Sequence, residues 1–169
     1  MQMSKARGTT VLFFCFCTLS AAAQSSDTAT DEAAIKEARR LQTQAIAKND
    51  LDTVVKYWDS AITIRRALGH PVDGAAAARK VLEPASPASP AAAIVYQREA
   101  TSVSVRPNWP LAYEEVRWSG HVGTVDSKPV LAGKYAAQWV KRNGSWLIRS
   151  EVFVAIDCAD VGCKAVALP

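Results

Sequence analysis

The first part of the chain has the hydrophobic spacing of helices. Between Thr30 and Asn49, aliphatic and small side chains recur every three to four positions, which predicts a helix with one face on the core. Thr30 favours the start as a cap, and Asp31 suits the first turn. Asp50 would then cap a short second helix that buries Leu51, Val54, Val55 and Trp58.

Alternation replaces this spacing from Ala61 onward. Ile62 and Ile64 alternate with polar residues, which predicts a strand. An alanine-rich third helix is expected at residues 74–82. Beyond a Pro/Ala-rich loop at residues 83–93, further alternation predicts strands at residues 94–106, 111–122, 132–142 and 145–156.

The order of these elements predicts an α+β fold. Four long strands joined by short turns form an antiparallel meander, and the preceding helices cover one of its faces. We expect one domain at residues 31–156, because a chain of this length buries most of its apolar surface around a single core. Residues 24–30 are expected to be a flexible lead, and residues 157–169 a C-terminal tail.

Residues 1–23 have the layout of a secretory signal peptide. Two basic residues precede an apolar run at residues 11–19, and Ala21–Ala23 suits cleavage after residue 23. The run is too short to cross a bilayer, which needs about 20 residues. We therefore predict an exported protein, periplasmic or secreted, with no membrane segment after cleavage. A lipid anchor on Cys15 or Cys17 is the alternative, which the neighbouring phenylalanines disfavour.

Cys158 and Cys163 are the two cysteines that follow the signal peptide. Their place in an exported chain predicts a disulfide between them, with a free or reactive pair as the alternative. A metal site has no support, because His70 and His121 are the only histidines and neither is spaced with further ligands. A nucleophilic hydrolase has no support, because the chain has no Gly-x-Ser-x-Gly elbow. It also has no glycine-rich dinucleotide fingerprint after a strand, and we expect no cofactor.

The net charge and the distribution of basic residues indicate which class of partner is not expected. The formal net charge is +4 for the full chain, and it falls to +2 on removal of the signal peptide, which holds two cations and no acids. Basic residues otherwise occur as isolated pairs and not as clusters, so nucleic acid is not an expected partner.

The order of elements and several short motifs resemble the nuclear transport factor 2-like superfamily, also called SnoaL-like. The motifs are Tyr57–Ile62 at the first strand, Asp73-Gly74 before the third helix, and Ala112–Glu114, Gly133–Tyr135 and Asn143–Ile148 in the sheet. The sheet motifs are similar to those of the superfamily's domain-of-unknown-function branch numbered 4440. The resemblance covers about residues 31 to 156 and indicates a fold more firmly than a function.

This resemblance implies a cone, in which a strongly curved antiparallel sheet holds three N-terminal helices in its concave face. For the isomerases of this fold it also implies a carboxylate base at the end of the first strand. Arg65 stands at that position here, and an arginine cannot accept a proton at ordinary pH. An isomerase of that mechanism is therefore not expected.

A ligand site inside the cone is a further implication of the resemblance. The side chains expected to line it are Tyr57, Trp58, Arg65, Tyr135, Trp139 and Ser150. Such a lining suits a small apolar molecule, and a cation at the cone mouth would favour an anionic one. The alternative is that these aromatic residues are ordinary core.

Alternation on the last strand separates Trp146, Ile148 and Ser150 from Arg149 and Glu151. The resemblance puts the Trp146 side on the concave face, so Arg149 and Glu151 are expected to form an ion pair on the convex face. Both histidines are expected to be solvated.

The convex face is also where we expect the chain to assemble. Proteins of this fold commonly pair through that face, and an apolar patch of Tyr113, Leu147 and Phe153 predicts a homodimer.

Two hypotheses for function remain open. In one, the protein is a binding or accessory module that holds a small apolar or anionic molecule. In the other, it is a small-molecule isomerase, lyase or hydrolase that uses pocket carboxylates such as Asp59, Glu115 or Glu151.

Overall fold

The computed structural model describes residues 28–83 and 94–159. The predicted signal peptide, most of the predicted Pro/Ala-rich loop and Cys163 lie outside these ranges, so the signal peptide, its cleavage and the Cys158–Cys163 disulfide stay predictions. The elements are α1 (Thr28–Ala47), α2 (Leu51–Val55), β1 (Trp58–Arg65), β2 (Val72–Asp73), α3 (Ala75–Leu82), β3 (Ile94–Val105), β4 (Leu111–Val122), β5 (Pro129–Arg142) and β6 (Ser145–Cys158).

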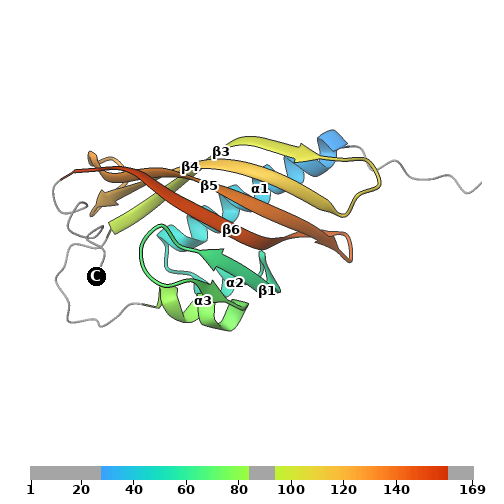
Figure 1. Ribbon diagram of the computed structural model, residues 1–169, viewed down its shortest axis with the longest axis horizontal. Helices are drawn as coiled ribbons and strands as arrows, with labels where there is room; N and C mark the ends of the chain where they lie inside the picture. Colours follow the sequence, from blue (N-terminus) through green and yellow to red (C-terminus); the bar gives the residue numbers. More distant parts are fainter. Residues whose placement is uncertain (1–27, 84–93, 160–169) are drawn as a thin grey trace, which may run out of the picture.

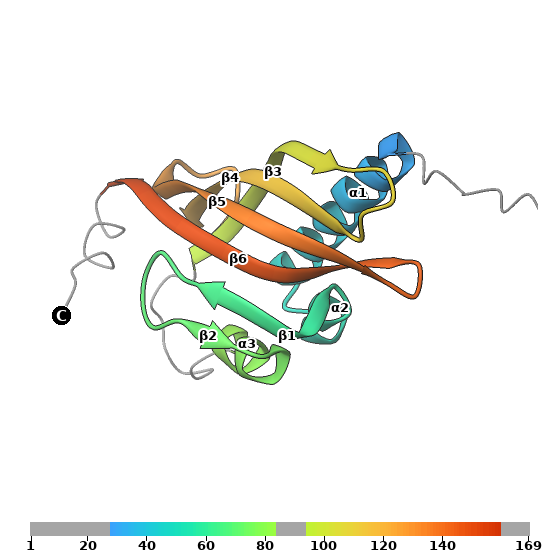
Figure 2. The same ribbon diagram turned by 45° about the vertical axis from the view of Figure 1, so that its right-hand side comes forward.

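The strands form one curved sheet in the order β2-β1-β6-β5-β4-β3, with β3 to β6 as the antiparallel meander that the sequence predicts (Figure 1). The α+β prediction is confirmed. One strand pairing was not predicted. β1 lies parallel to β6, so an early strand of the domain pairs with its last strand (Figure 2).

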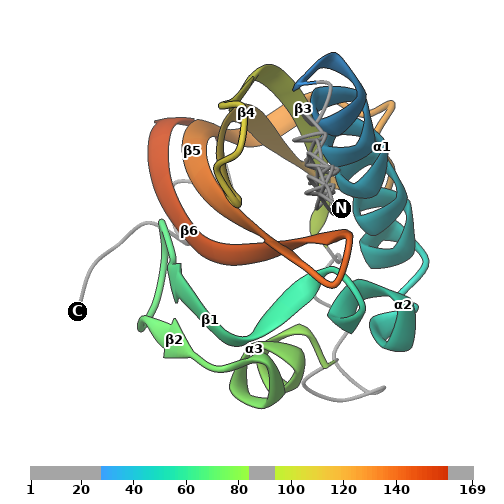
Figure 3. The ribbon, with the colours of Figure 1, turned by 90° about the vertical axis from the view of Figure 1, so that its right-hand side faces the viewer.

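The helices take two places around this sheet. Seen end-on, the sheet curls from β3 round to β1, and α1 lies along its open side (Figure 3). There α1 packs mainly against β3, whereas α3 packs against β1, β2 and α2. The interior of the curl is therefore divided between a part covered by α1 and a part between α3 and the sheet.

Local chemistry explains the start of α2 and the turn between β5 and β6. Asp50 accepts a hydrogen bond from the Thr53 backbone N–H at 3.1 Å and so caps α2 as expected. Asn143 and Gly144 both have positive φ angles, 50° and 81°, which a tight hairpin between β5 and β6 requires.

The structure differs from the predicted elements in several places. Helix α1 begins at Thr28, two residues before the predicted cap, so part of the predicted flexible lead is helical. Trp58 begins β1 and does not belong to α2. The short strand β2 was not predicted.

No helix in the described ranges is long and apolar enough to cross a membrane. The exposed apolar side chains of the convex face are Tyr113, Val152, Val154 and Ile156. Leu147 and Phe153, which we expected in that patch, are half-buried, and Phe153 lines an interior cavity. The predicted homodimer remains a prediction.

Candidate functional site

A β-bulge in β6 decides which of its side chains enter the interior. Trp139 pairs with Ile148, whereas Gln138 pairs with Ser150, so Arg149 is an extra residue without a partner in β5. Such a bulge moves the following residues to the opposite face. Ile148 and Glu151 consequently both point inward, and they are 0% and 2% exposed.

The expected convex ion pair between Arg149 and Glu151 is therefore wrong. Arg149 is half-exposed and donates from Nη1 to Asp59 Oδ1 at 2.8 Å. Asp59 is 3% exposed and also accepts from Arg142 Nε at 2.5 Å and from the Ala61 backbone N–H at 3.0 Å. Burial raises the pKa of Asp59, but these hydrogen bonds outweigh it and hold the pKa below its ordinary value.

Glu151 instead belongs to a buried ionic cluster under α1. Arg39, which is 1% exposed, projects from α1 and donates from Nη2 to Glu114 Oε2 at 2.8 Å and from Nη1 to Glu151 Oε1 at 2.9 Å. Its Nη1 also donates to Gln42 Oε1 at 2.6 Å. Trp139 Nε1 adds a hydrogen bond to Glu114 Oε2 at 2.8 Å.

Aromatic rings complete the surroundings of the Arg39 guanidinium. Its central carbon lies 5.2 Å from the ring centre of Tyr135 and 5.1 Å from that of Trp139, within the range of a cation–π contact. Burial alone would lower the pKa of Arg39, but its interactions with Tyr135, Glu151 and Glu114 raise it. The guanidinium is therefore charged at any ordinary pH.

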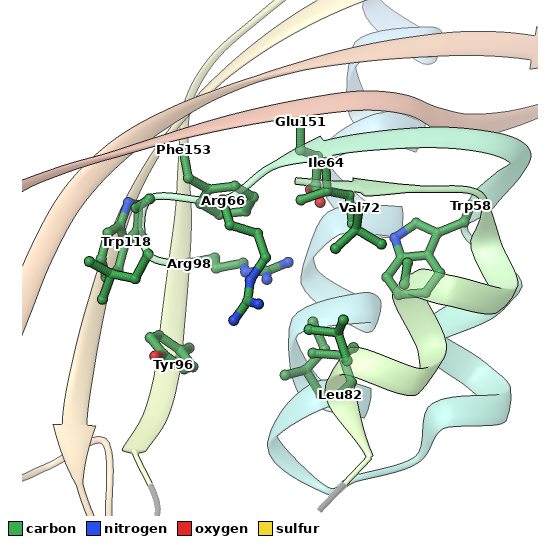
Figure 4. Close-up of a pocket in the computed structure, with 15 residues that line it drawn as sticks. Trp58, Ile64, Arg66, Val72, Leu82, Tyr96, Arg98, Trp118, Glu151 and Phe153 are labelled. Atoms are coloured by element: carbon green, nitrogen blue, oxygen red, sulfur yellow. The ribbon is translucent and has the colours of Figure 1, made fainter. Parts of the chain in front are cut away.

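Beside this cluster lies a cavity of about 230 Å³ (Figure 4). Its walls come from α1, β1, the segment after β1, α3, β3, β4 and β6, so distant parts of the chain meet there. Most of its lining is aliphatic or aromatic, from Ile46, Trp58, Ile64, Val72, Leu82, Tyr96, Trp118 and Phe153. The charged groups on its wall are Arg66, Arg98 and Glu151, and the hydroxyl of Tyr96 and the indole N–H of Trp58 and Trp118 are further polar groups of lining residues.

Neither Arg66 nor Arg98 forms a salt bridge with a carboxylate of residues 28–83 or 94–159. Arg98 is held by aromatic faces, with its central carbon 5.5 Å from the Phe153 ring centre and 5.7 Å from that of Tyr135. Burial raises the pKa of the Tyr96 hydroxyl, and the charges of Arg66 and Arg98 oppose that shift. Both cations therefore act at the same end of the cavity.

Gly69 lies close to the guanidinium of Arg66. Gly69 has a φ of 88°, which favours glycine, and a Cβ there would lie 3.0 Å from Arg66 Nη1. The turn after β1 thus lets the Arg66 side chain lie close against the backbone.

Glu151 is the carboxylate that reaches both the cluster and the cavity. Arg39 holds its Oε1, while within the described chain no group donates a hydrogen bond to Oε2. The side chain is among those that line the cavity. One oxygen is thus fixed from behind, and the other is available to a bound molecule.

The structure places only one of the six predicted ligand residues in this cavity, namely Trp58. Tyr135 and Trp139 lie in the neighbouring ionic cluster and contact Arg39. Tyr57 and Ser150 are half-buried and are not part of the cavity wall.

Arg65 is exposed and pairs with Asp73 at 2.8 Å, so its predicted place at the cone mouth is wrong. The next residue, Arg66, has that place. The sequence held a signal for this, because Arg66 follows Ile62 and Ile64 at a spacing of two. Arg98 follows Ile94 and Tyr96 at the same spacing, so alternation also favoured it. Glu151 had no such signal, since it changes face at a bulge.

The two histidines differ. His70 is exposed as expected, whereas His121 is 5% exposed, so its predicted solvation is wrong. In the described ranges no group of three or more histidine, cysteine, aspartate and glutamate residues is arranged to hold a metal ion.

No model of a known protein family matches the chain, and no curated protein matches it. Solved structures do. A nuclear transport factor 2-like protein of unknown function from Pseudomonas putida superposes with a TM-score of 0.62 at 15% identity, over 80% of this chain and 93% of that one.

Two further solved structures are of proteins named after enzymes. A putative scytalone dehydratase from Novosphingobium aromaticivorans gives a TM-score of 0.61 at 14% identity, over 76% of this chain and 85% of that one. A ketosteroid isomerase-like protein from Erwinia carotovora atroseptica gives 0.59 at 14% identity, over 75% and 97%. The chain thus has the nuclear transport factor 2-like fold, as its motifs predicted, while the branch numbered 4440 stays a prediction.

Proposed function

We propose that the protein binds a small monoanionic molecule with an apolar body in the cavity beside the ionic cluster. The observation that carries this proposal is the pair of guanidinium groups, Arg66 and Arg98, that line an otherwise apolar cavity without carboxylate partners in the described residues. A guanidinium fork matches a carboxylate or phosphate in geometry and charge.

The charges around the cavity favour one negative charge on the ligand. Three guanidiniums, of Arg39, Arg66 and Arg98, face two carboxylates, of Glu114 and Glu151, which leaves one positive charge in excess. A monoanion neutralises the site, whereas a cation would add to the excess. Arg66 is exposed and Arg98 is half-buried, so water solvates this excess charge in the free protein, and a bound monoanion that replaces the water restores neutrality.

The volume sets the size of the apolar body. Drug-sized ligands occupy pockets of roughly 300–1,000 Å³, and a cavity of about 150 Å³ holds benzene. A cavity of about 230 Å³ therefore suits a single ring with a short acidic side chain. The aromatic walls formed by Trp58, Trp118 and Phe153 suit such a ring.

The test measures thermal stabilisation and calorimetric affinity with phenylacetate and with benzyl alcohol, its neutral counterpart. We expect phenylacetate to stabilise the protein by about 2.7 kcal/mol at 100 times its dissociation constant. Arg66→Met and Arg98→Met should each weaken phenylacetate about tenfold or more and leave benzyl alcohol unchanged.

The matched control is Arg65→Met, which removes the neighbouring arginine that pairs with Asp73 outside the cavity. It should leave phenylacetate affinity unchanged. Equal losses in Arg65→Met and Arg66→Met, or no stabilisation by any monoanion, would contradict the proposal.

One observation favours catalysis as a second candidate function. Among the three carboxylates weighed from the sequence, Asp59 is held by two arginines and Glu115 is exposed, so only Glu151 lines the cavity. Its Oε2 could accept a proton from a bound substrate. Turnover of a bound monoanion that disappears in Glu151→Gln, while its affinity persists, would support this candidate.

A further inference from the structure

A serine and a histidine lie in contact near the end of β4, on the side of the sheet away from the cavity. Ser119 Oγ lies 2.8 Å from His121 Nε2, and His121 Nδ1 lies 2.6 Å from the Ser127 backbone oxygen. A carbonyl oxygen only accepts, so Nδ1 carries a proton. In the neutral ring, Nε2 is then free to accept the proton of the Ser119 hydroxyl.

The local backbone fixes this arrangement. Gly120 pairs with Leu131 but His121 pairs with Pro129, so β5 has one extra residue here and the pairing shifts. The turn that follows begins at Gly123, with a φ of 79°, and Ser127 Oγ donates to the Val122 backbone oxygen at 2.9 Å. This turn buries His121 and leaves Ser119 half-buried.

Ser119 lines a groove of about 360 Å³ on the convex face. The register explains the hollow, because Ser119 lies between Gln97 of β3 and Ala132 of β5, and the alanine is too short to fill the space. In the adjacent row Arg117 lies beside Lys134. Both of these cations line the same groove.

We propose that Ser119 is a nucleophile activated by His121 and that it accepts acyl groups from small carboxylic esters. Nucleophile, base and a group that orients the base are all present, and the orienting group is the Ser127 carbonyl. The fold offers this at a place separate from the cavity, with the Trp118 side chain lining both.

The proposed step balances as an ordinary acyl transfer. Ser119 Oγ attacks the ester carbonyl carbon while its proton passes to His121 Nε2. The tetrahedral intermediate collapses, the carbon–oxygen bond to the leaving alcohol breaks, and His121 returns the proton to that oxygen. Water then hydrolyses the acyl-serine by the same proton path. The proposed partners of the developing oxyanion are Arg117 and Lys134, while Glu99 and Asp157 line the same groove and offset part of their charge.

The test is covalent labelling of the full-length protein with a biotinylated fluorophosphonate, followed by mass spectrometry of the labelled peptide. Ser119 should be labelled in the folded protein and not after heat denaturation, and Ser119→Ala should abolish the label. His121→Gln should slow labelling by about 100-fold or more, since general-base catalysis contributes about 10² to 10⁴. The burst of nitrophenol released from p-nitrophenyl acetate should likewise be fastest in the wild type, slower in His121→Gln and absent in Ser119→Ala.

Ser102→Ala is the matched control, because Ser102 lies on the convex face too and is more exposed than Ser119, but it contacts Glu115 at 3.4 Å and no imidazole. Its labelling should equal that of the wild type. Ser119→Ala removes one half-buried oxygen and retains the fold, so the test does not depend on the stability of His121→Gln. Absence of labelling, or labelling that persists in Ser119→Ala, overturns the proposal.

Discussion

The two parts of the interior use arginine in opposite ways. Under α1, the Arg39 guanidinium is surrounded by two carboxylates, an amide oxygen and two aromatic rings. In the cavity, Arg66 and Arg98 have no carboxylate partner within the described chain, and the space before them is apolar. The charge of Arg39 is thus balanced by carboxylates of its own chain, whereas the charges of the two cavity arginines are not.

The difference separates a charge that stabilises the fold, that of Arg39, from the charges of Arg66 and Arg98, which the proposed function assigns to ligand binding. A buried guanidinium needs partners from its own chain, because loss of hydration costs several kcal/mol. A guanidinium at a cavity wall keeps contact with water until a ligand replaces that water. Glu151 belongs to both parts, since Arg39 fixes one of its oxygens and the other borders the cavity.

The largest expected effect is on the ionic cluster. Arg39→Met leaves Glu114 and Glu151 buried without their cation, and it should lower the free energy of unfolding by about 3 to 5 kcal/mol. Urea titration followed by circular dichroism measures this. Arg40→Met is the control, because the Arg40–Glu37 pair is exposed and its loss should change stability far less than that of Arg39. Similar losses of unfolding free energy in both variants would contradict the view that the buried cluster stabilises the fold more than an exposed ion pair does.

A smaller effect is expected at Asp59, whose depressed pKa links stability to pH. The stabilisation by its ionised form is fully present above the ordinary pKa of about 4 and is lost as pH falls through the lower folded-state pKa. Both partner arginines are about half-exposed, so screening limits the effect to about 1 kcal/mol.

Asp59→Asn should therefore be less stable than the wild type at pH 7 and equally stable at pH 2. Denaturant midpoints at a series of pH values measure the difference. A gap between wild type and variant that stays constant down to pH 2 would show that Asp59 acts through packing and not through its charge.

The smallest effects on stability are expected in the cavity. Arg98→Met removes cation–π contacts with Phe153 and Tyr135 and should cost about 0.5 to 1 kcal/mol. Arg66→Met should change the free energy of unfolding by less than about 0.5 kcal/mol, which is usual for the substitution of an exposed side chain. Thermal denaturation without ligand measures both. A loss as large as that of Arg39→Met would show that the cavity arginines also hold the fold.

Much of the fold could be predicted from hydrophobic spacing alone. The helix at residues 28–47 and the four strands of the meander follow from regular periods, and Asn143-Gly144 marks the hairpin between the last two strands. The parallel pairing of β1 with β6 could not be predicted in this way, because it joins segments far apart in sequence.

The candidate site was harder to predict because it depends on where the alternation breaks. Strict alternation placed Glu151 outside, and the extra residue Arg149 brings it inside. Arg65 was chosen from its place in a family motif, although alternation with Ile62 and Ile64 favours Arg66. Bulges are set by the pairing of two strands, so one strand's sequence does not reveal them.

The parallel pairing of β1 with β6 also has a consequence for how the protein folds. Trp58 pairs with Ile148, so one wall of the cavity cannot meet the other until nearly the whole domain is in place. Contacts between segments so distant in sequence form slowly, since a long loop must close before they stabilise anything. A chain still leaving the ribosome, with β6 not yet emerged, therefore has no complete cavity, and the proposed ligand affinity appears only when the last strand docks.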